Sequence, residues 1–254
     1  VKVVEDAGPF VVNNSRIELA EPISQLRIES EFVIDKSGLG LVGERGSPTV
    51  DQVRRAALAM PDLSEYGPAP YLFASRLVRI EPAIGIWAGE FIAGDQPIVA
   101  MGMALMGAIY SEFKFDSKAT QADTPPIEAF RKRRGVCQDF AQIMIIALRA
   151  HGIPAAYVSG YLRTRPPPGS PRLIGADATH AWVNIWCGPD LGWVGFDPTN
   201  NAVAQHNHIF TAMGRDYADV APIDGVFYGQ SGQHVKVSVD VRPIEAGVGE
   251  LQAG

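Results

Sequence analysis

The sequence predicts an α+β fold, in which a long helix packs on an antiparallel sheet and a short β-rich segment precedes both. The helix is indicated by apolar residues at helical spacing after position 137. The sheet is indicated by residues 180–186 and 192–197, two β-rich runs joined by the turn residues Gly188, Pro189 and Asp190. Residues 1–37 alternate apolar and polar positions in short bursts between turn signals, which predicts strands there as well.

The predicted central helix begins near Cys137 and runs to about Arg149. A thiol at a helix start faces unpaired backbone amides and the positive end of the helix dipole, and both favour thiolate over thiol. Cys137 is therefore a candidate nucleophile, although a free cysteine is more often a small buried apolar residue. The apolar stripe of this helix and its stop signal are Phe140, Ile143, Met144, Ala147, Leu148, Gly152 and Pro154.

Two polar residues fall where the two predicted strands meet. His180 begins the first strand, and Asp197 ends the second, directly before Pro198. In an antiparallel hairpin these two positions lie at the same edge, so we expect the imidazole and the carboxylate to be adjacent. Together with Cys137 they form the series of nucleophile, base and orienting carboxylate that covalent catalysis by a thiol requires.

The same residues lie in motifs that resemble those of the transglutaminase-like superfamily, in its bacterial branch of cysteine peptidases. The resemblance extends over about residues 100–240 and implies a papain/transglutaminase-like core. It also implies that Cys137 is the nucleophile, His180 the base and Asp197 the carboxylate that orients the base. The matching motifs are GVCQDFA at 135–141, GIPAAYVSGYL at 152–162, DATHAW at 177–182, GW at 192–193 and FDPT at 196–199.

The implied reaction is attack of the Cys137 thiolate on an amide carbonyl, which leaves a thioester acyl-enzyme. We expect the backbone amide of Cys137 to stabilise the oxyanion, with a Gln138 or Trp182 side chain as a further donor or substrate contact. Hydrolysis of the thioester would make the chain a cysteine protease or amidase, which we favour for a bacterial chain of this type. Transfer to an amine would make it a protein-glutamine gamma-glutamyltransferase. A third hypothesis, a non-catalytic protein-binding module, is disfavoured by the intact series of three residues.

We expect neither a cofactor nor a metal. No run of spaced acidic residues resembles a calcium loop. His206 and His208 would share one face of a strand, and a zinc site made of Cys137, His180, His206 and His208 is the alternative. No acidic or cysteine ligand stands at ligand spacing beside the histidine pair, which argues against zinc.

Two charged stretches have structural interpretations. Residues 131–134 are four consecutive cations that either favour a thiolate at Cys137 or complement the end of a helix. Residues 214–220 resemble a signature of the bacterial branch, and we interpret Arg215, Asp216 and Asp219 as an ion network that fixes a loop.

Composition narrows the class of partner. The chain has 254 residues, 46% of them hydrophobic, and a net charge of −6, which argues against nucleic acid. The apolar run at 98–110 is shorter than the roughly 20 residues that a membrane span requires. Two cysteines give no disulfide framework, so we expect a cytoplasmic location, with Cys187 as an inert thiol. The expected partner is a protein or peptide substrate.

The domain organisation follows from these patterns. We expect residues 1–45 to be the last part of a larger β module, residues 46–245 to form the catalytic domain and residues 246–254 to be a flexible tail. The proline-rich residues 165–177 would form a loop at the rim of the site. Further expected elements are helices at 50–60, 97–111 and 124–134, a helix or an extended pair of turns at 71–80, and strands at 26–29, 32–34, 113–115, 155–163 and 235–241.

Overall fold

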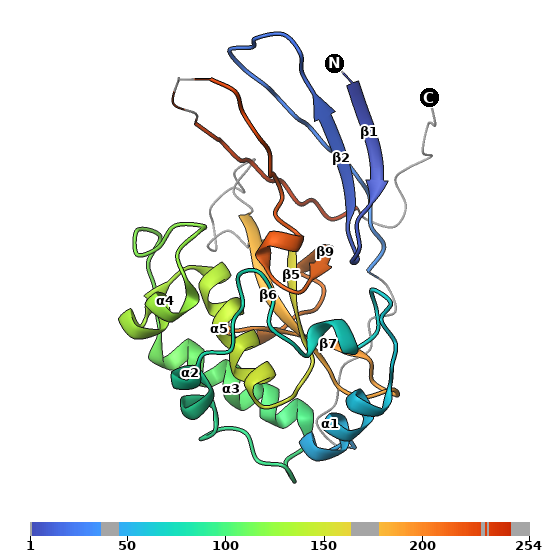
Figure 1. Ribbon diagram of the computed structural model, residues 1–254, viewed down its shortest axis with the longest axis vertical. Coiled ribbons are helices and arrows are strands. Elements are labelled where there is room, and N and C mark those ends of the chain that lie inside the picture. The colour runs from blue at the N-terminus through green and yellow to red at the C-terminus, as the bar shows by residue number, and fades with distance from the viewer. Residues whose placement is uncertain (1, 37–45, 164–177, 230–231, 233, 245–254) are drawn as a thin grey trace.

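A computed structural model of the chain describes residues 2–36, 46–163, 178–229, 232 and 234–244. It confirms the α+β fold, with a five-stranded sheet beside a group of helices (Figure 1). The strand order is β8-β7-β6-β5-β9, and every neighbouring pair in it is antiparallel. The strands are β5 (Ala155–Leu162), β6 (Ala178–Trp186), β7 (Trp193–Asp197), β8 (Ala202–Val203) and β9 (His208–Gly214).

The helices α2, α3 and α5 lie side by side on one side of this sheet (Figure 1). α5 begins at Cys137 as predicted, and every residue from 139 to 149 is buried. Since each large apolar side chain that is buried contributes about 1.5–3 kcal/mol, packing fixes the position of this helix. The helices are α1 (Val50–Ala59), α2 (Pro82–Ala88), α3 (Ile98–Glu112), α4 (Pro126–Lys132) and α5 (Cys137–Ala150), with 3-10 turns at Ala69–Tyr71 and Tyr217–Asp219.

Two glycines fit α5 and α3 to their neighbours. Gly152 has a φ of 69°, so the residue that follows the end of α5 adopts the left-handed conformation that the sequence predicts. Gly102 in α3 lies against β7, where an added Cβ would be 2.7 Å from ring atoms of Phe196. The missing side chain lets α3 pack closely against the strand that ends at Asp197.

The opposite face of the sheet is also buried. Trp182, Met213 and Tyr71 belong to a second apolar cluster, and Phe10 and Val11 pack against it. Val11 forms a β-bridge with Met213, which ties the N-terminal segment to β9. Residues on both faces of the sheet are therefore buried, although Phe210 and Thr211 on the edge strand β9 stay exposed.

Several element boundaries differ from the prediction. Residues 71–80 do not form a helix; a 3-10 turn at Ala69–Tyr71 leads into irregular chain, and α2 follows unpredicted. The helix predicted at 124–134 begins at Pro126, because Pro125 is its N-cap, and ends where Arg133 adopts a φ of 52°. α1 and α3 match their predicted ranges to within two residues.

The ends of the chain hold fewer strands than predicted. β1 (Lys2–Ala7) and β2 (Asn13–Glu18) form an antiparallel hairpin that projects beyond the sheet (Figure 1). Residues 26–29, 32–34 and 235–241 are not strands, although their residues alternate. Val235 and Val237 remain exposed, so burial supplies no driving force for strand pairing there. The remaining short ladder pairs β3 (Lys114–Phe115) with β4 (Arg134–Gly135) in parallel.

Within the described residues, no helix has the length and apolar character needed to cross a membrane.

Candidate active site

Cys137 is the first residue of α5, and its side chain is half-buried. The start of the helix is held by Asp139, whose carboxylate accepts the Val136 amide at 2.8 Å and the Thr120 hydroxyl at 2.6 Å. Burial raises the pKa of Asp139, although both hydrogen bonds favour its charged form. Gly135 leaves room for this cap, since an added Cβ would lie 2.6 Å from the carboxylate. The position of the thiol is thus fixed by buried polar contacts.

His180 and Asp197 meet at one end of the sheet. β6 and β7 are paired with Val183 opposite Phe196, which places the start of β6 beside the end of β7. His180 Nε2 lies 2.8 Å from Asp197 Oδ2, and both side chains are buried. Burial alone would raise the pKa of Asp197, but hydrogen bonds from His180 and His208 outweigh it and hold this pKa well below its usual range.

The Cys137 thiol also acts on the His180 ring, as one of the interactions that raise the His180 pKa. Since Nε2 lies against Asp197, the ring nitrogen left for the thiol is Nδ1. Burial alone would lower the pKa of His180, but the interactions with Asp197 and Cys137 raise it to about 9. A raised pKa favours the imidazolium form of His180 at neutral pH.

Two further side chains reach the same carboxylate, and neither is predicted there from the sequence. His208 Nε2 lies 2.9 Å from Asp197 Oδ2, and Asn200 Nδ2 lies 2.7 Å from that oxygen and 3.3 Å from His180 Nε2. The other carboxylate oxygen accepts the backbone amides of Thr199 at 3.0 Å and Asn200 at 3.2 Å. The position of Asn200 three residues after Asp197 is a local signal for such a turn, whereas His208 carries no comparable signal.

Known proteins with similar sequences indicate the family of this chain. The family model of the transglutaminase-like superfamily core matches residues 86–198, which contain all three predicted catalytic residues. The chain is 38% identical over 240 residues to the Mycobacterium tuberculosis protein Rv2569c, covering 91% of this chain and 74% of the relative. The chain belongs to the transglutaminase-like superfamily.

Two of the similar proteins have names that state an activity. A Pseudomonas aeruginosa protein-glutamine gamma-glutamyltransferase is 36% identical over 110 residues, which are 42% of this chain and 16% of that protein. The structure of a proposed cysteine protease from Cytophaga hutchinsonii is 30% identical with a TM-score of 0.50. That match covers 60% of this chain and 48% of the other, so it spans about half the length of the solved relative.

The side chains predicted to assist at the oxyanion have other contacts in this transglutaminase-like chain. Gln138 donates its Nε2 to the carbonyl oxygen of Ala122 at 2.8 Å. Trp182 is buried, and its ring meets the edge of His208 at a centroid distance of 5.2 Å and an angle of 76°. Trp182 therefore supports the imidazoles, and Gln138 ties the loop before α4 to α5.

The four residues of the alternative zinc site do not form one group of metal ligands among the described residues. Among the described residues, the group whose donor atoms lie close enough to hold a metal is His180, Asp197 and His208, within 4.8 Å of one another. His206 is exposed and outside this group, as is Cys137. The two imidazole nitrogens of the group are each in hydrogen-bonding contact with the same Asp197 oxygen. Protons shared with the carboxylate account for this geometry.

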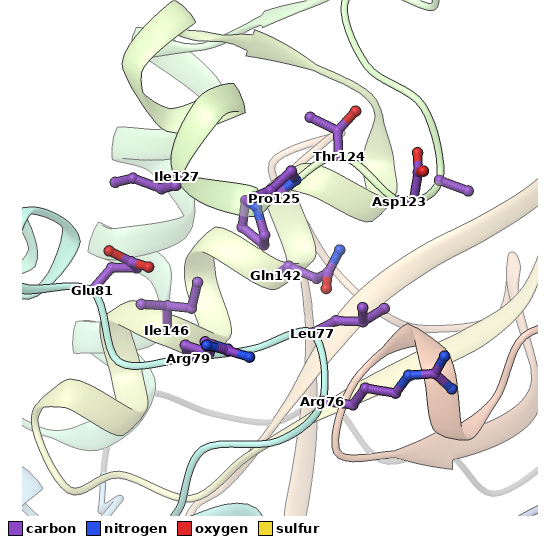
Figure 2. A pocket seen from close by; sticks show the side chains of 12 residues that line it. Arg76, Leu77, Arg79, Glu81, Asp123, Thr124, Pro125, Ile127, Gln142 and Ile146 are labelled. Carbon is purple, nitrogen blue, oxygen red and sulfur yellow. The ribbon is translucent and has the colours of Figure 1, made fainter.

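A cavity of about 330 Å³ lies along α5 (Figure 2). The carbonyl oxygen of the Gln142 amide is buried and lacks a hydrogen-bond partner among the described residues. Gln142 stands one helical turn beyond Gln138, whose contact with Ala122 joins a wall of the cavity to the helix. The cavity is lined by Arg76, Leu77, Arg79, Glu81, Ala122, Asp123, Thr124, Pro125, Pro126, Ile127, Gln142 and Ile146.

The cationic run at 131–134 is engaged in structural contacts. Arg133 pairs with Glu112 at 3.2 Å, and its guanidinium lies over the rings of Phe130 and Phe113. The run also includes the ion pairs Lys132–Glu128 at 3.6 Å and Arg134–Asp116 at 3.6 Å. These contacts favour the structural interpretation of the run.

The 214–220 stretch is also structural, in part as predicted. Arg215 pairs with Asp219 at 2.9 Å, whereas the Asp216 carboxylate accepts the backbone amides of Leu77 at 2.7 Å and Ala218 at 2.9 Å. Arg149 from α5 joins this region by donating to the Arg215 carbonyl oxygen at 2.6 Å. The ion network predicted for this loop therefore contains the Arg215–Asp219 ion pair, and both carboxylates also bind backbone amides.

Cys187, the second thiol, is fully buried, and burial raises its pKa to about 12. This agrees with its predicted inert role. The predicted rim loop at 165–177 and the tail at 246–254 lie outside the described residues, as does the boundary drawn at residue 45.

Proposed function

We propose that this chain cleaves amide or peptide bonds through a Cys137 thioester. The observation that carries the proposal is the His180 imidazole, which is hydrogen-bonded to the Asp197 carboxylate and whose pKa is raised by both Asp197 and the Cys137 thiol. The series lies at the start of a buried helix, where unpaired amides face the reacting atoms. The three groups come from three separate elements, α5, β6 and β7. Only the tertiary fold brings them together.

In the proposed resting state, Cys137 is a thiolate and His180 an imidazolium. Asp197 accepts a hydrogen bond from the Nε2–H group of His180, and the Nδ1–H group is directed toward the sulfur of Cys137. The raised His180 pKa of about 9 supports this charge distribution at neutral pH. The thiolate is the nucleophilic form of cysteine, so the paired state is ready to attack a carbonyl carbon.

The thiolate would form a bond to the amide carbonyl carbon, and the carbonyl electrons would move to oxygen. The first intrahelical bond of α5 runs from the Phe140 amide to the Val136 carbonyl oxygen, so the amides of Cys137 and Gln138 precede it and are available to the oxyanion. Collapse would break the carbon–nitrogen bond, while the Nδ1 proton of His180 passes to the departing amine. A thioester on Cys137 and a neutral imidazole result.

The second step distinguishes two activities. His180, now neutral, would take a proton from water, and the hydroxide would displace sulfur to release an acid. We favour this hydrolysis, in keeping with the proposed cysteine protease from Cytophaga hutchinsonii. Transfer to an amine is the second candidate, because the Pseudomonas aeruginosa relative is a protein-glutamine gamma-glutamyltransferase.

The rate of Cys137 alkylation by iodoacetamide against pH, followed by intact mass, tests the proposal without a known substrate. The variants are wild type, His180→Ala and Cys187→Ala. We expect one rapid label on wild type and Cys187→Ala well below pH 8.5, and slow labelling of His180→Ala. Labelling that follows an ordinary thiol in all three proteins would refute the activated pair and favour the non-catalytic binding module.

Substrate turnover separates the two candidate activities. Glutamine-containing peptides and peptide amides would be incubated with and without a primary amine such as cadaverine, with Cys137→Ala as the blank. We expect release of amine or ammonia that is independent of cadaverine. Incorporation of cadaverine into the peptide, with little acid product, would instead support the acyl transferase.

A further inference from the structure

We infer that His208 is a fourth functional member of this site, a positioning residue that fixes the Asp197 carboxylate for His180. The inference rests on the proposed function. Its physical basis is one carboxylate oxygen shared by two imidazoles, because Asp197 Oδ2 lies 2.8 Å from His180 Nε2 and 2.9 Å from His208 Nε2. All three side chains are buried, so water does not compete for these contacts.

The tautomer of His208 follows from its second nitrogen. The backbone amide of Gln205 donates to His208 Nδ1 at 3.4 Å. A backbone amide keeps its proton, so Nδ1 must present a lone pair and the ring proton must be on Nε2. His208 is therefore a neutral ring that donates from Nε2 to Asp197, which makes its role different from that of His180.

His208 is held in place by contacts on several sides. The Trp182 ring meets it edge to face, and the Lys36 ammonium donates to its backbone carbonyl oxygen. The His180 ring lies at a centroid distance of 6.1 Å and an angle of 44°. With this packing and the Gln205 amide, the Nε2 proton has a defined direction, toward Asp197.

The sheet brings His208 to Asp197 from a distant strand. Two strands, β6 and β5, separate β7 from β9, and neighbouring strands are about 4.8 Å apart, so the backbones of β7 and β9 are about 14 Å apart across the sheet. The side chains of His208 and Asp197 bridge this separation. Gly160 on β5 permits close packing at this point, because an added Cβ would lie 2.5 Å from the Trp182 ring and 2.2 Å from the Ile209 carbonyl oxygen.

For catalysis, the consequence is that the Asp197 carboxylate is restrained from rotating. The backbone amides of Thr199 and Asn200 hold one carboxylate oxygen, and His208 and Asn200 hold the other. With His208 in place, the second oxygen faces His180 Nε2. Without it, the carboxylate loses one of its three side-chain donors on that oxygen and gains freedom to turn away from His180. The imidazolium that pairs with Cys137 would then be less stabilised.

The test compares the pH dependence of Cys137 alkylation in four variants. His208→Gln can place an N–H near the position of Nε2, whereas His208→Leu and His208→Asn cannot. His206→Leu, two residues away and exposed, is the matched control. We expect His206→Leu and His208→Gln to stay within about twofold of wild type at pH 6.5, and the other two to label about tenfold more slowly. All should converge at pH 10, where any accessible thiol is ionised.

Wild-type profiles for His208→Leu and His208→Asn, with slow labelling of His180→Ala, would overturn the positioning role and leave the proposed function standing. An unchanged profile in His180→Ala as well would overturn both. Should the two disruptive variants fail to fold, nitrogen-15 NMR of histidine in the wild-type protein decides. We expect the Nε2–H tautomer for His208, and the Nδ1–H tautomer would refute the inference.

Discussion

Replacing Asp197 by Asn removes one negative charge from the site and keeps the shape of the side chain. The His180 pKa of about 9 exceeds the ordinary histidine value of 6.5, a difference that corresponds to about 3 kcal/mol in favour of the imidazolium. In Asp197→Asn, the burial that lowers this pKa is no longer opposed by a carboxylate. We therefore expect the His180 pKa to fall to 6.5 or below.

The change in protonation is large at pH 7.5. About 97% of His180 is protonated at a pKa of about 9, and about 10% at 6.5. Loss of the imidazolium would leave Cys137 without its cationic partner. A thiol with the ordinary pKa of about 8.5 is only about 1% ionised at pH 6.5, so we expect alkylation there to slow by up to about 100-fold.

The measurement is the second-order rate of iodoacetamide labelling between pH 5 and 10, with far-ultraviolet circular dichroism to confirm folding. Asp190→Asn is the control, because Asp190 is exposed in the turn before β7 and the substitution changes the net charge equally. A labelling rate at pH 6.5 in Asp197→Asn equal to that of wild type would refute the claim that this carboxylate maintains the charged pair.

Three further predictions concern the site and its support. Gly135→Ala should displace the Asp139 cap, lower stability by about 1–2 kcal/mol in urea titration and slow Cys137 alkylation; unchanged values in both assays would contradict the role of this cap. Gln142→Met should raise stability by about 1 kcal/mol by removing a buried carbonyl without a partner; a lower melting temperature would mean that the carbonyl is hydrogen-bonded inside the cavity. Since the His180 pKa is raised, its stabilising contribution should be complete below pH 6.5 and lost as pH rises through 9, so the stability gap between wild type and His180→Gln should shrink across that range; a gap that widens with pH would show the opposite sign.

The parts of the fold that the sequence predicts well are those with strong local signals. The nucleophile helix has an apolar stripe, a glycine stop at Gly152 and a proline two residues later, and its observed bounds are Cys137–Ala150. The alternation at 235–241 is equally clear, yet no strand forms, because alternation predicts a strand only where a face is buried. α2 was missed because its seven residues are too few for helical periodicity to emerge.

The candidate site also contains residues that the sequence predicts and residues that it does not. Cys137 begins α5, Asp197 ends β7 and His180 lies two residues into β6, close to the positions that local turn signals identify, so their approach could be predicted. The contact between His208 and Asp197 depends on the antiparallel pairings that place β9 and β7 in one sheet. Such long-range pairings are not encoded within a short window of sequence, and so the sequence offers His208 only as a member of a disfavoured zinc site.

The burial of Asp197 explains why so many donors converge on it. A carboxylate shielded from water is costly unless its lone pairs are used, and the backbone amides of Thr199 and Asn200 are not sufficient to fill both oxygens. His180 supplies one further donor, but its proton must remain responsive to the thiol. A neutral donor such as His208 stabilises the anion without cancelling its negative charge. The charge of Asp197 is then left to act on His180. On this argument, the fourth residue allows the buried carboxylate to be both stable and directed at the base.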